Sequence, residues 1–108
     1  MRVRISRHAC ARFAEHHPLH ARPTDLRRVL GISIEVSKEM AFALSSGNPL
    51  HPSMSGEACR FFVTPNGLGM FVLKPDKGKN SNRLVMPTYL RLPQDPKRDA
   101  LLQELGIR

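Results

Sequence analysis

The residues best suited to chemistry lie close together near the N-terminus, between Ser6 and His16. A helix that begins after Ser6, whose hydroxyl can cap it, places four polar side chains on one face: His8, Arg12, Glu15 and His16. An imidazole, a guanidinium and a carboxylate on one face can bind a phosphate group and transfer a proton near neutral pH. The same spacing also fits an ordinary amphipathic helix, so a chemical role and a structural role are both open.

A cluster of histidines at the end of this stretch raises the question of a metal site. His16, His17 and His20 are close in sequence, but Pro18 interrupts the helix that would align His16 with His20. No cysteine or aspartate lies at the spacing that zinc ligands usually have. We therefore expect no metal site and no other cofactor.

The charge balance indicates which partners are favoured. The 108 residues include 17 Lys and Arg against nine Asp and Glu, a formal charge of +8. This excess favours nucleic acid first, an acidic protein second and anionic lipid third. The sequence contains no apolar run of about 18 residues and no apolar core of a signal peptide, so we expect a cytoplasmic protein without a membrane segment. Cys10 and Cys59 lack paired metal-type spacing and are expected to be buried thiols.

These side chains must be positioned by the elements that the pattern predicts for the N-terminal half. Alternation over residues 1–5 predicts a strand, and a helix is expected over Arg7–His17, ended by Pro18. A second helix is expected to begin at Pro23-Thr24-Asp25, with Thr24 as a possible cap.

Residues 32–44 fit two patterns. Ile32, Ile34 and Val36 alternate as in a strand, yet apolar residues keep helical spacing as far as Leu44. The longer register favours a helix over Ser33–Leu44. Whether residues 24–45 form one kinked helix or two is left open.

The C-terminal half has the pattern of an antiparallel sheet. Strands over 60–64 and 69–74 flank Pro65-Asn66-Gly67, a strong hairpin turn. A third strand is expected over 83–92, where Pro87 implies an edge strand or a bulge.

The predicted fold is α+β, in one domain over residues 1–108. An N-terminal strand and two to three helices pack on a three- to four-stranded antiparallel sheet, followed by a C-terminal helix over 95–105 that ends at Gly106. The expected core residues are Phe13, Leu44, Phe61, Phe62, Phe71 and Val72.

The order of elements and the first helix resemble small RelE-like proteins of the barnase/RelE-like superfamily, which includes ribonuclease toxins and uncharacterised phage or mobile-element relatives. The residues that carry the resemblance are Ser6, His8, Ala9 and Arg12, then Val85, Thr88 and Leu90. It covers about residues 3–92, and residues 93–108 form a C-terminal helical extension outside it.

The resemblance implies a metal-independent endoribonuclease. If it is a toxin, a small acidic antitoxin is expected as its partner. Such enzymes cleave RNA by attack of the ribose 2′-hydroxyl. The implied catalytic residues are His8 as proton shuttle, Arg12 on the phosphate, and Glu15 as base or as the partner of Arg12. Further nucleic-acid contacts are expected from Lys74, Lys77, Lys79, Arg83, Thr88, Tyr89 and Arg91.

Two alternatives remain open at this point. The same cationic residues can serve a nucleic-acid-binding protein without catalysis. The chain can also be a small phage-type inhibitor or adaptor that docks on an acidic host protein.

Overall fold

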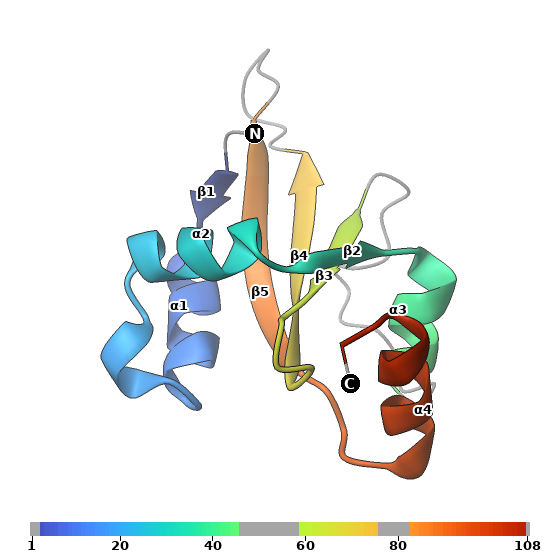
Figure 1. Ribbon diagram of the computed structural model, residues 1–108. Helices are drawn as coiled ribbons and strands as arrows, with labels where there is room; N and C mark the ends of the chain where they lie inside the picture. Colours follow the sequence, from blue (N-terminus) through green and yellow to red (C-terminus); the bar gives the residue numbers. More distant parts are fainter. Residues whose placement is uncertain (1–2, 46–58, 76–82, 108) are drawn as a thin grey trace.

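A mixed sheet of five strands, in the order β1-β5-β4-β3-β2, runs through the middle of the molecule (Figure 1). The computed structural model describes residues 3–45, 59–75 and 83–107. The strands are β1 (Val3–Ile5), β2 (Ile34–Val36), β3 (Arg60–Val63), β4 (Gly69–Pro75) and β5 (Leu84–Arg91). The helices are α1 (Arg7–Ala14), α2 (Pro23–Gly31), α3 (Lys38–Leu44) and α4 (Pro96–Glu104), with a 3-10 turn, η1 (Pro18–His20).

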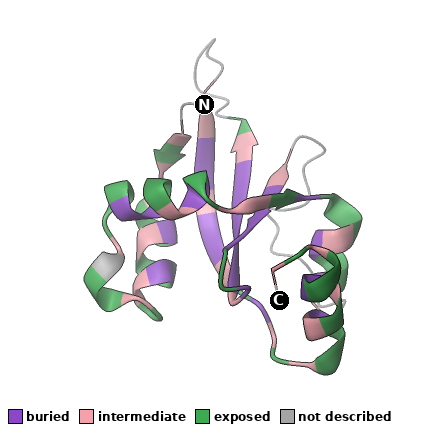
Figure 2. Cartoon of the chain, viewed as in Figure 1, coloured by how far each residue is buried: buried purple, intermediate pink, exposed green. Residues whose placement is uncertain are grey.

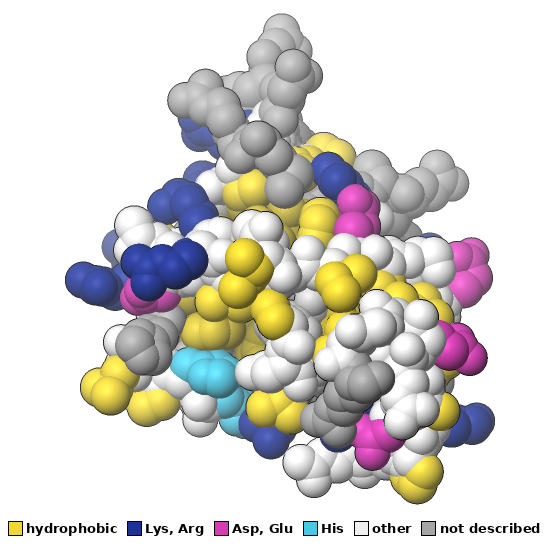
Figure 3. All heavy atoms as spheres, viewed as in Figure 1, with side chains coloured by type: hydrophobic (Ala, Val, Ile, Leu, Met, Phe, Trp, Pro, Cys, Tyr) yellow, Lys and Arg dark blue, Asp and Glu magenta, His cyan; other side chains and the backbone are white. Residues whose placement is uncertain are grey.

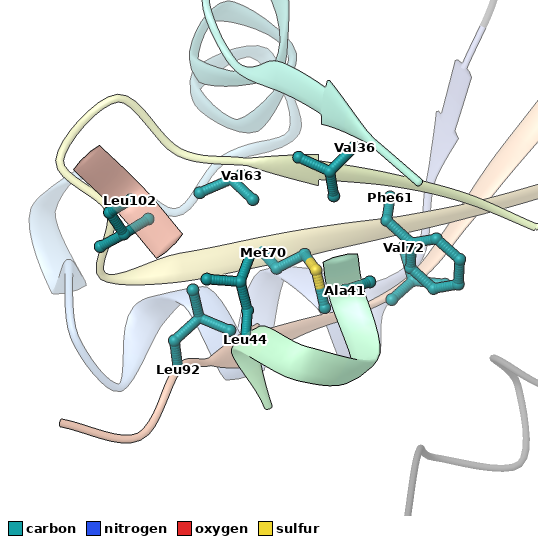
Figure 4. Packing of buried hydrophobic residues seen from close by; sticks show 9 residues of the cluster. All are labelled: Val36, Ala41, Leu44, Phe61, Val63, Met70, Val72, Leu92 and Leu102. Carbon is teal, nitrogen blue, oxygen red and sulfur yellow. The ribbon is translucent and has the colours of Figure 1, made fainter. Parts of the chain in front are cut away.

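Each face of the sheet has its own hydrophobic core, because successive residues of a strand point to opposite faces. On one face, Phe61 and Val72 pack with residues of α3 and α4 (Figure 4). On the other face, Phe62 and Phe71 pack with residues of α1 and α2. The predicted core residues are all buried: Phe13, Leu44, Phe61, Phe62, Phe71 and Val72. Buried positions follow the two long central strands of the sheet (Figure 2).

The α+β class and the C-terminal helix are confirmed, and the sheet has more strands than the three to four expected. Strand β1 pairs in parallel with β5, from Val3 beside Leu84 to Ile5 beside Met86. The other neighbouring strands pair antiparallel. The sheet is therefore mixed and not purely antiparallel as expected. Alternation along β1 indicates a strand, but it does not indicate which distant strand it joins or in which direction.

The predicted helix over Ser33–Leu44 is wrong in its first part, where the strand alternative holds. Residues Ile34–Val36 form β2, which pairs antiparallel with β3. Ser37 then caps α3, its hydroxyl accepting from the Met40 backbone N–H at 3.1 Å. The backbone N–H and C=O groups of β3 supply β2 with hydrogen-bond partners. The spacing of apolar residues in the sequence does not reveal such partners, because they belong to a distant segment. Residues 24–45 therefore contain two helices separated by a strand, not one kinked helix.

Helix α1 ends at Ala14 rather than at the predicted His17. The backbone N–H groups of His16 and His17 both donate to the Phe13 carbonyl, at 3.1 and 2.9 Å. The chain therefore makes one last turn after α1 before Pro18 begins η1.

Helix α2 begins at Pro23, one residue before Thr24, the expected cap. Arg22, not Thr24, occupies the cap position, with Pro23 as the first helical residue. The Asp25 carboxylate accepts from the Arg22 backbone N–H at 3.1 Å and from its guanidinium at 3.3 Å. Burial raises the pKa of Asp25, but these bonds outweigh it and hold the pKa below its usual value.

The turn and the last helix follow the sequence prediction. Asn66 accepts from the Leu68 backbone N–H at 3.0 Å, and Gly67 adopts a φ of 72° that favours glycine. Asp95 caps α4, and Gly106, with a φ of 77°, follows its end.

Both cysteines are half-buried, and neither forms a disulfide. Burial raises the pKa of the Cys10 thiol, although the nearby Arg27 charge acts in the opposite direction. Among the helices of the described residues, none is long and apolar enough to cross a membrane.

Replacing Gly69 tests the packing of β4 against β5. A methyl group at Gly69 would overlap the Tyr89 ring, so we expect Gly69→Ala to lower the free energy of unfolding by about 1–3 kcal/mol. Gly31→Ala is the matched control, since an added Cβ there meets nothing within 4 Å. It should leave stability unchanged or raise it by up to about 1 kcal/mol. Equal effects of the two variants in urea denaturation would contradict this packing.

The edge strand β2 is held by an ion pair between Glu35 and Arg60. Two hydrogen bonds of 2.8 and 2.7 Å join them, and the guanidinium lies 5.3 Å from the centre of the Phe62 ring. The hydrogen bond from Arg60 lowers the pKa of Glu35 despite partial desolvation.

Glu35→Gln should therefore have a pH-dependent effect on stability. The side chains of Glu35 and Arg60 are 45 % and 41 % exposed, so solvent screening limits the loss to less than about 1 kcal/mol. The loss is present above 4.5, the usual pKa of glutamate, and disappears as the pH falls through the lowered value in the folded protein. Urea denaturation at several pH values measures it, with Glu104→Gln as a control. A loss that grows toward low pH would refute this role of the pair.

Candidate functional site

The apolar side of α1 rests on β4 and β5 and leaves its polar side in solvent. Ala9 and Phe13 are buried, at 0 % and 3 % exposure. The Phe13 ring meets the Tyr89 ring edge-on at 4.9 Å and stacks on the Phe71 ring at 5.8 Å. The opposite side of α1 carries His8, Arg12 and Glu15, which are exposed.

Ser6 fixes where α1 begins relative to β5. Its backbone N–H donates to the Met86 carbonyl at 3.2 Å, and its hydroxyl donates to the Pro87 carbonyl at 3.0 Å. The same hydroxyl accepts from the Ala9 backbone N–H at 3.0 Å, as the helix cap predicted from the sequence. One serine therefore joins the helix start to the middle of β5.

A bulge in β5 decides which of its side chains face α1. Val72 pairs with Thr88 and Lys74 pairs with Val85, so the single residue between them on β4 lies opposite Met86 and Pro87 on β5. The predicted bulge at Pro87 is confirmed, whereas the edge alternative is wrong because β5 lies between β1 and β4.

The extra residue shifts the alternation along the rest of the strand. Met86 and Tyr89, three residues apart, both pack in the core under α1 and α2. Arg91 follows Tyr89 by two residues, so it lies on the same face of the sheet.

Arg91 meets the end of α1 there. Its Nη1 lies 2.9 Å from Nδ1 of His16, and both side chains are exposed. Arginine only donates hydrogen bonds, so Nδ1 accepts and the neutral imidazole carries its proton on Nε2. With Nδ1 accepting from Arg91, the Nε2–H of His16 is a donor in addition to the guanidinium of Arg91.

A second pair lies beside the first. Nη1 of Arg12 is 3.3 Å from Oε1 of Glu15, with the two side chains 44 % and 51 % exposed. Glu15 and His16 are consecutive, so the two pairs adjoin at the end of α1. Together they offer two guanidinium groups, an imidazole and one carboxylate, a combination suited to binding a phosphate group.

Among the described residues predicted to contact nucleic acid, Arg91 is the one exposed at this end of α1. Lys74 and Arg83 belong to the opposite end of the β4–β5 pair, since Pro75 pairs with Leu84 and Gly69 pairs with Arg91. At about 3.3 Å per residue, the length of β5 separates the two ends by roughly 20 Å. Lys77 and Lys79 lie outside the described residues.

Thr88 and Tyr89 were predicted to contact nucleic acid, and here the prediction fails. Their exposed fractions are 1 % and 2 %. The Tyr89 ring packs on Phe13 and Phe71, and burial raises its pKa. Both side chains belong to the interior of the protein, because the bulge turns Tyr89 under α1 and Thr88 to the other face.

His16 is the residue of this site that the sequence predictions did not include. Its position on the polar side of α1 was recognised, but its partner Arg91 is 75 residues away in the sequence. His17 turns instead toward the interior, its ring stacked on Phe13 at 4.6 Å. Within the described ranges, no group of three or more His, Cys, Asp or Glu could hold a metal ion.

Comparison with protein-family models finds no family that matches, and comparison with curated proteins and with solved structures finds no match either. The geometry on α1 and β5 therefore carries the functional argument.

Removing the Ser6 hydroxyl tests how α1 is placed. Ser6→Ala loses both the cap and the bond to Pro87, and we expect it to lower the free energy of unfolding by about 1–2 kcal/mol. It should also shift the imidazole NMR signals of His16, because the end of α1 moves relative to Arg91. Ser37→Ala removes only a cap on α3 and should leave these signals unchanged. Unchanged His16 signals in Ser6→Ala would contradict the coupling.

Proposed function

We propose that the protein is an endoribonuclease that binds and cleaves RNA on the exposed side of α1. The observation that carries the proposal is the row of polar groups there: the Arg12–Glu15 pair beside the Arg91–His16 contact. The resemblance of the sequence to RelE-like proteins and the formal charge of +8 also support RNA as the ligand.

The proposed cleavage needs no metal ion. The ribose 2′-oxygen forms a bond to phosphorus as the bond between phosphorus and the 5′-oxygen breaks, which leaves a cyclic phosphate and a 5′-hydroxyl. A base takes the proton of the 2′-hydroxyl, and an acid gives a proton to the departing 5′-oxygen. In-line displacement places these two oxygens on opposite sides of phosphorus.

The spacing along α1 fits this requirement. His8 precedes Arg12 by about 6 Å along the helix axis, and Glu15 follows it by about 4.5 Å, at 1.5 Å per residue. In the proposed arrangement Arg12 holds the phosphate, Glu15 is the base and the protonated imidazole of His8 is the acid. Arg91 and the Nε2–H of His16 add donors that stabilise the charge on the phosphate oxygens.

A second function, binding without cleavage, is favoured by the Arg12–Glu15 ion pair itself. The carboxylate that would act as base already accepts a hydrogen bond from Arg12, so it is engaged in an ion pair rather than open to a ribose hydroxyl. The same cationic surface can also be covered by an acidic protein, such as an antitoxin or a host protein.

One experiment separates these functions. Labelled mixed-sequence RNA is incubated in EDTA with the wild type and with His8→Ala, Arg12→Gln and Glu15→Gln, all shown to be folded. We expect cyclic-phosphate ends from the wild type, and a rate at least about 100-fold lower for His8→Ala and Glu15→Gln. Arg12→Gln should weaken binding as well as cleavage. Lys97→Gln, an equal loss of charge on α4, is the matched control and should change neither.

The other outcomes are equally definite. Salt-sensitive RNA binding that needs Arg12 and Arg91, without cleavage, would replace the enzyme by the non-catalytic binder. Cleavage of an RNA whose 2′-hydroxyls are all methylated would refute the proposed reaction. Absence of both binding and cleavage would refute an RNA function and leave an acidic protein partner to be sought.

A further inference from the structure

A largely apolar pocket of about 280 Å³ lies between the end of α1, the end of α2 and the β3–β4 turn. Phe13 and His17 line it from the end of α1, and Val29 and Ile32 line it from α2 and the residue that caps its end. Residues 64–66 of the β3–β4 turn close the remaining side. Figure 3 shows histidine side chains bordering exposed hydrophobic side chains on this face of the molecule. The volume lies just below the range of drug-sized ligand sites, so it suits a single ring system.

The walls of the pocket suit a flat heterocycle. The rings of Phe13 and His17 stack at 4.6 Å with an angle of 27° between their planes, which gives one wall an aromatic surface. Bases of single-stranded RNA bind proteins by stacking on such side chains, histidine included.

A polar group at the rim can bind the edge of such a ring. Oδ1 of Asn66 accepts from the Thr64 hydroxyl at 2.6 Å and from the Leu68 backbone N–H at 3.0 Å. Because a backbone N–H can only donate, this oxygen assignment is fixed and the remaining amide group of Asn66 is a donor. A base carries ring nitrogens and carbonyl oxygens that accept hydrogen bonds from such a group.

The pocket also lies next to the phosphate-binding groups. His17, which lines the pocket, directly follows His16. Across the pocket, the backbone N–H of Thr64 donates to the carbonyl of Gly69, and Gly69 pairs with Arg91 in the sheet. A nucleotide carries its base and its phosphate on one sugar, which matches an apolar pocket bordered by cationic side chains.

We propose that this pocket holds one unstacked base of single-stranded RNA while Arg12 and Arg91 bind the adjoining phosphate. The proposal rests on the RNA function above and adds to it a site for a base. Binding is then expected to depend on one base position far more than on its neighbours, whereas phosphate contacts alone are insensitive to the bases.

An abasic scan tests the proposal. Affinity is measured by fluorescence polarisation for a short single-stranded RNA with 2′-O-methyl groups, which blocks cleavage, and for versions lacking one base each. We expect the loss of one particular base to weaken binding roughly tenfold, and the loss of the others to have little effect.

Two variants locate the effect in the pocket. Ile32→Gln changes a side chain that is 66 % exposed, so folding should be preserved. His17→Ala removes part of the aromatic wall. Each variant should weaken binding of the intact RNA and abolish its dependence on the sensitive base. Phe42→Gln, which changes an exposed apolar residue on α3, is the matched control and should do neither.

The remaining outcomes distinguish the two proposals. If no base position is sensitive while Arg91→Gln still weakens binding, the pocket proposal is overturned and the RNA function stands. If Ile32→Gln and His17→Ala bind normally and keep the dependence on one base, that base binds elsewhere and the pocket proposal is overturned. If the wild type binds no RNA, both proposals fail.

Discussion

One extra residue in β5 determines how the polar surface of this protein is assembled. The bulge at Met86 and Pro87 turns Tyr89 under α1 and brings Arg91 onto the same face. Without it, strict alternation would send Tyr89 and Arg91 to the face that α3 and α4 cover. The contact between Arg91 and His16 therefore depends on a feature of the backbone in the middle of β5.

Proline suits that position for a physical reason. It has no N–H to donate, and a bulge is one of the few places inside a sheet where a donor is not required. The Pro87 carbonyl still accepts from the Ser6 hydroxyl, so the bulge also becomes the attachment point of α1. The start of α1 and the shift in β5 are thus set by the same few atoms.

The two outer strands of the sheet are held in place by several interactions, each of which contributes little stabilising free energy. Strands β1 and β2 have three residues each. A bond of 3.2 Å from Arg27 to the Val3 carbonyl ties β1 to α2, and the Glu35–Arg60 pair ties β2 to β3. Some of the positive charge is therefore used within the fold, by Arg27 and Arg60 and by Arg98, which is 4 % exposed. The net charge by itself does not identify a binding surface, whereas the structure groups two exposed guanidinium groups, Arg12 and Arg91, at the end of α1.

The sequence by itself determined the features that depend on near neighbours. The cap at Ser6, the turn at Asn66 and Gly67, the end of α4 at Gly106 and the buried aromatic residues follow from local hydrogen bonding, backbone freedom and alternation. The polar row on α1 was also predicted, because helical spacing fixes which side chains share a face.

Only the tertiary structure decided what depends on distant partners. Residues 34–36 became a strand because β3 offers them hydrogen bonds, although the helical spacing that continues to Leu44 favoured a helix. Thr88 and Tyr89 became interior residues, and Arg91 became the partner of His16, because the position of a bulge sets the face of every residue after it. The sequence contains the proline that permits the bulge. It does not show which strand pairs with β5, and that pairing decides which face each later side chain of β5 occupies.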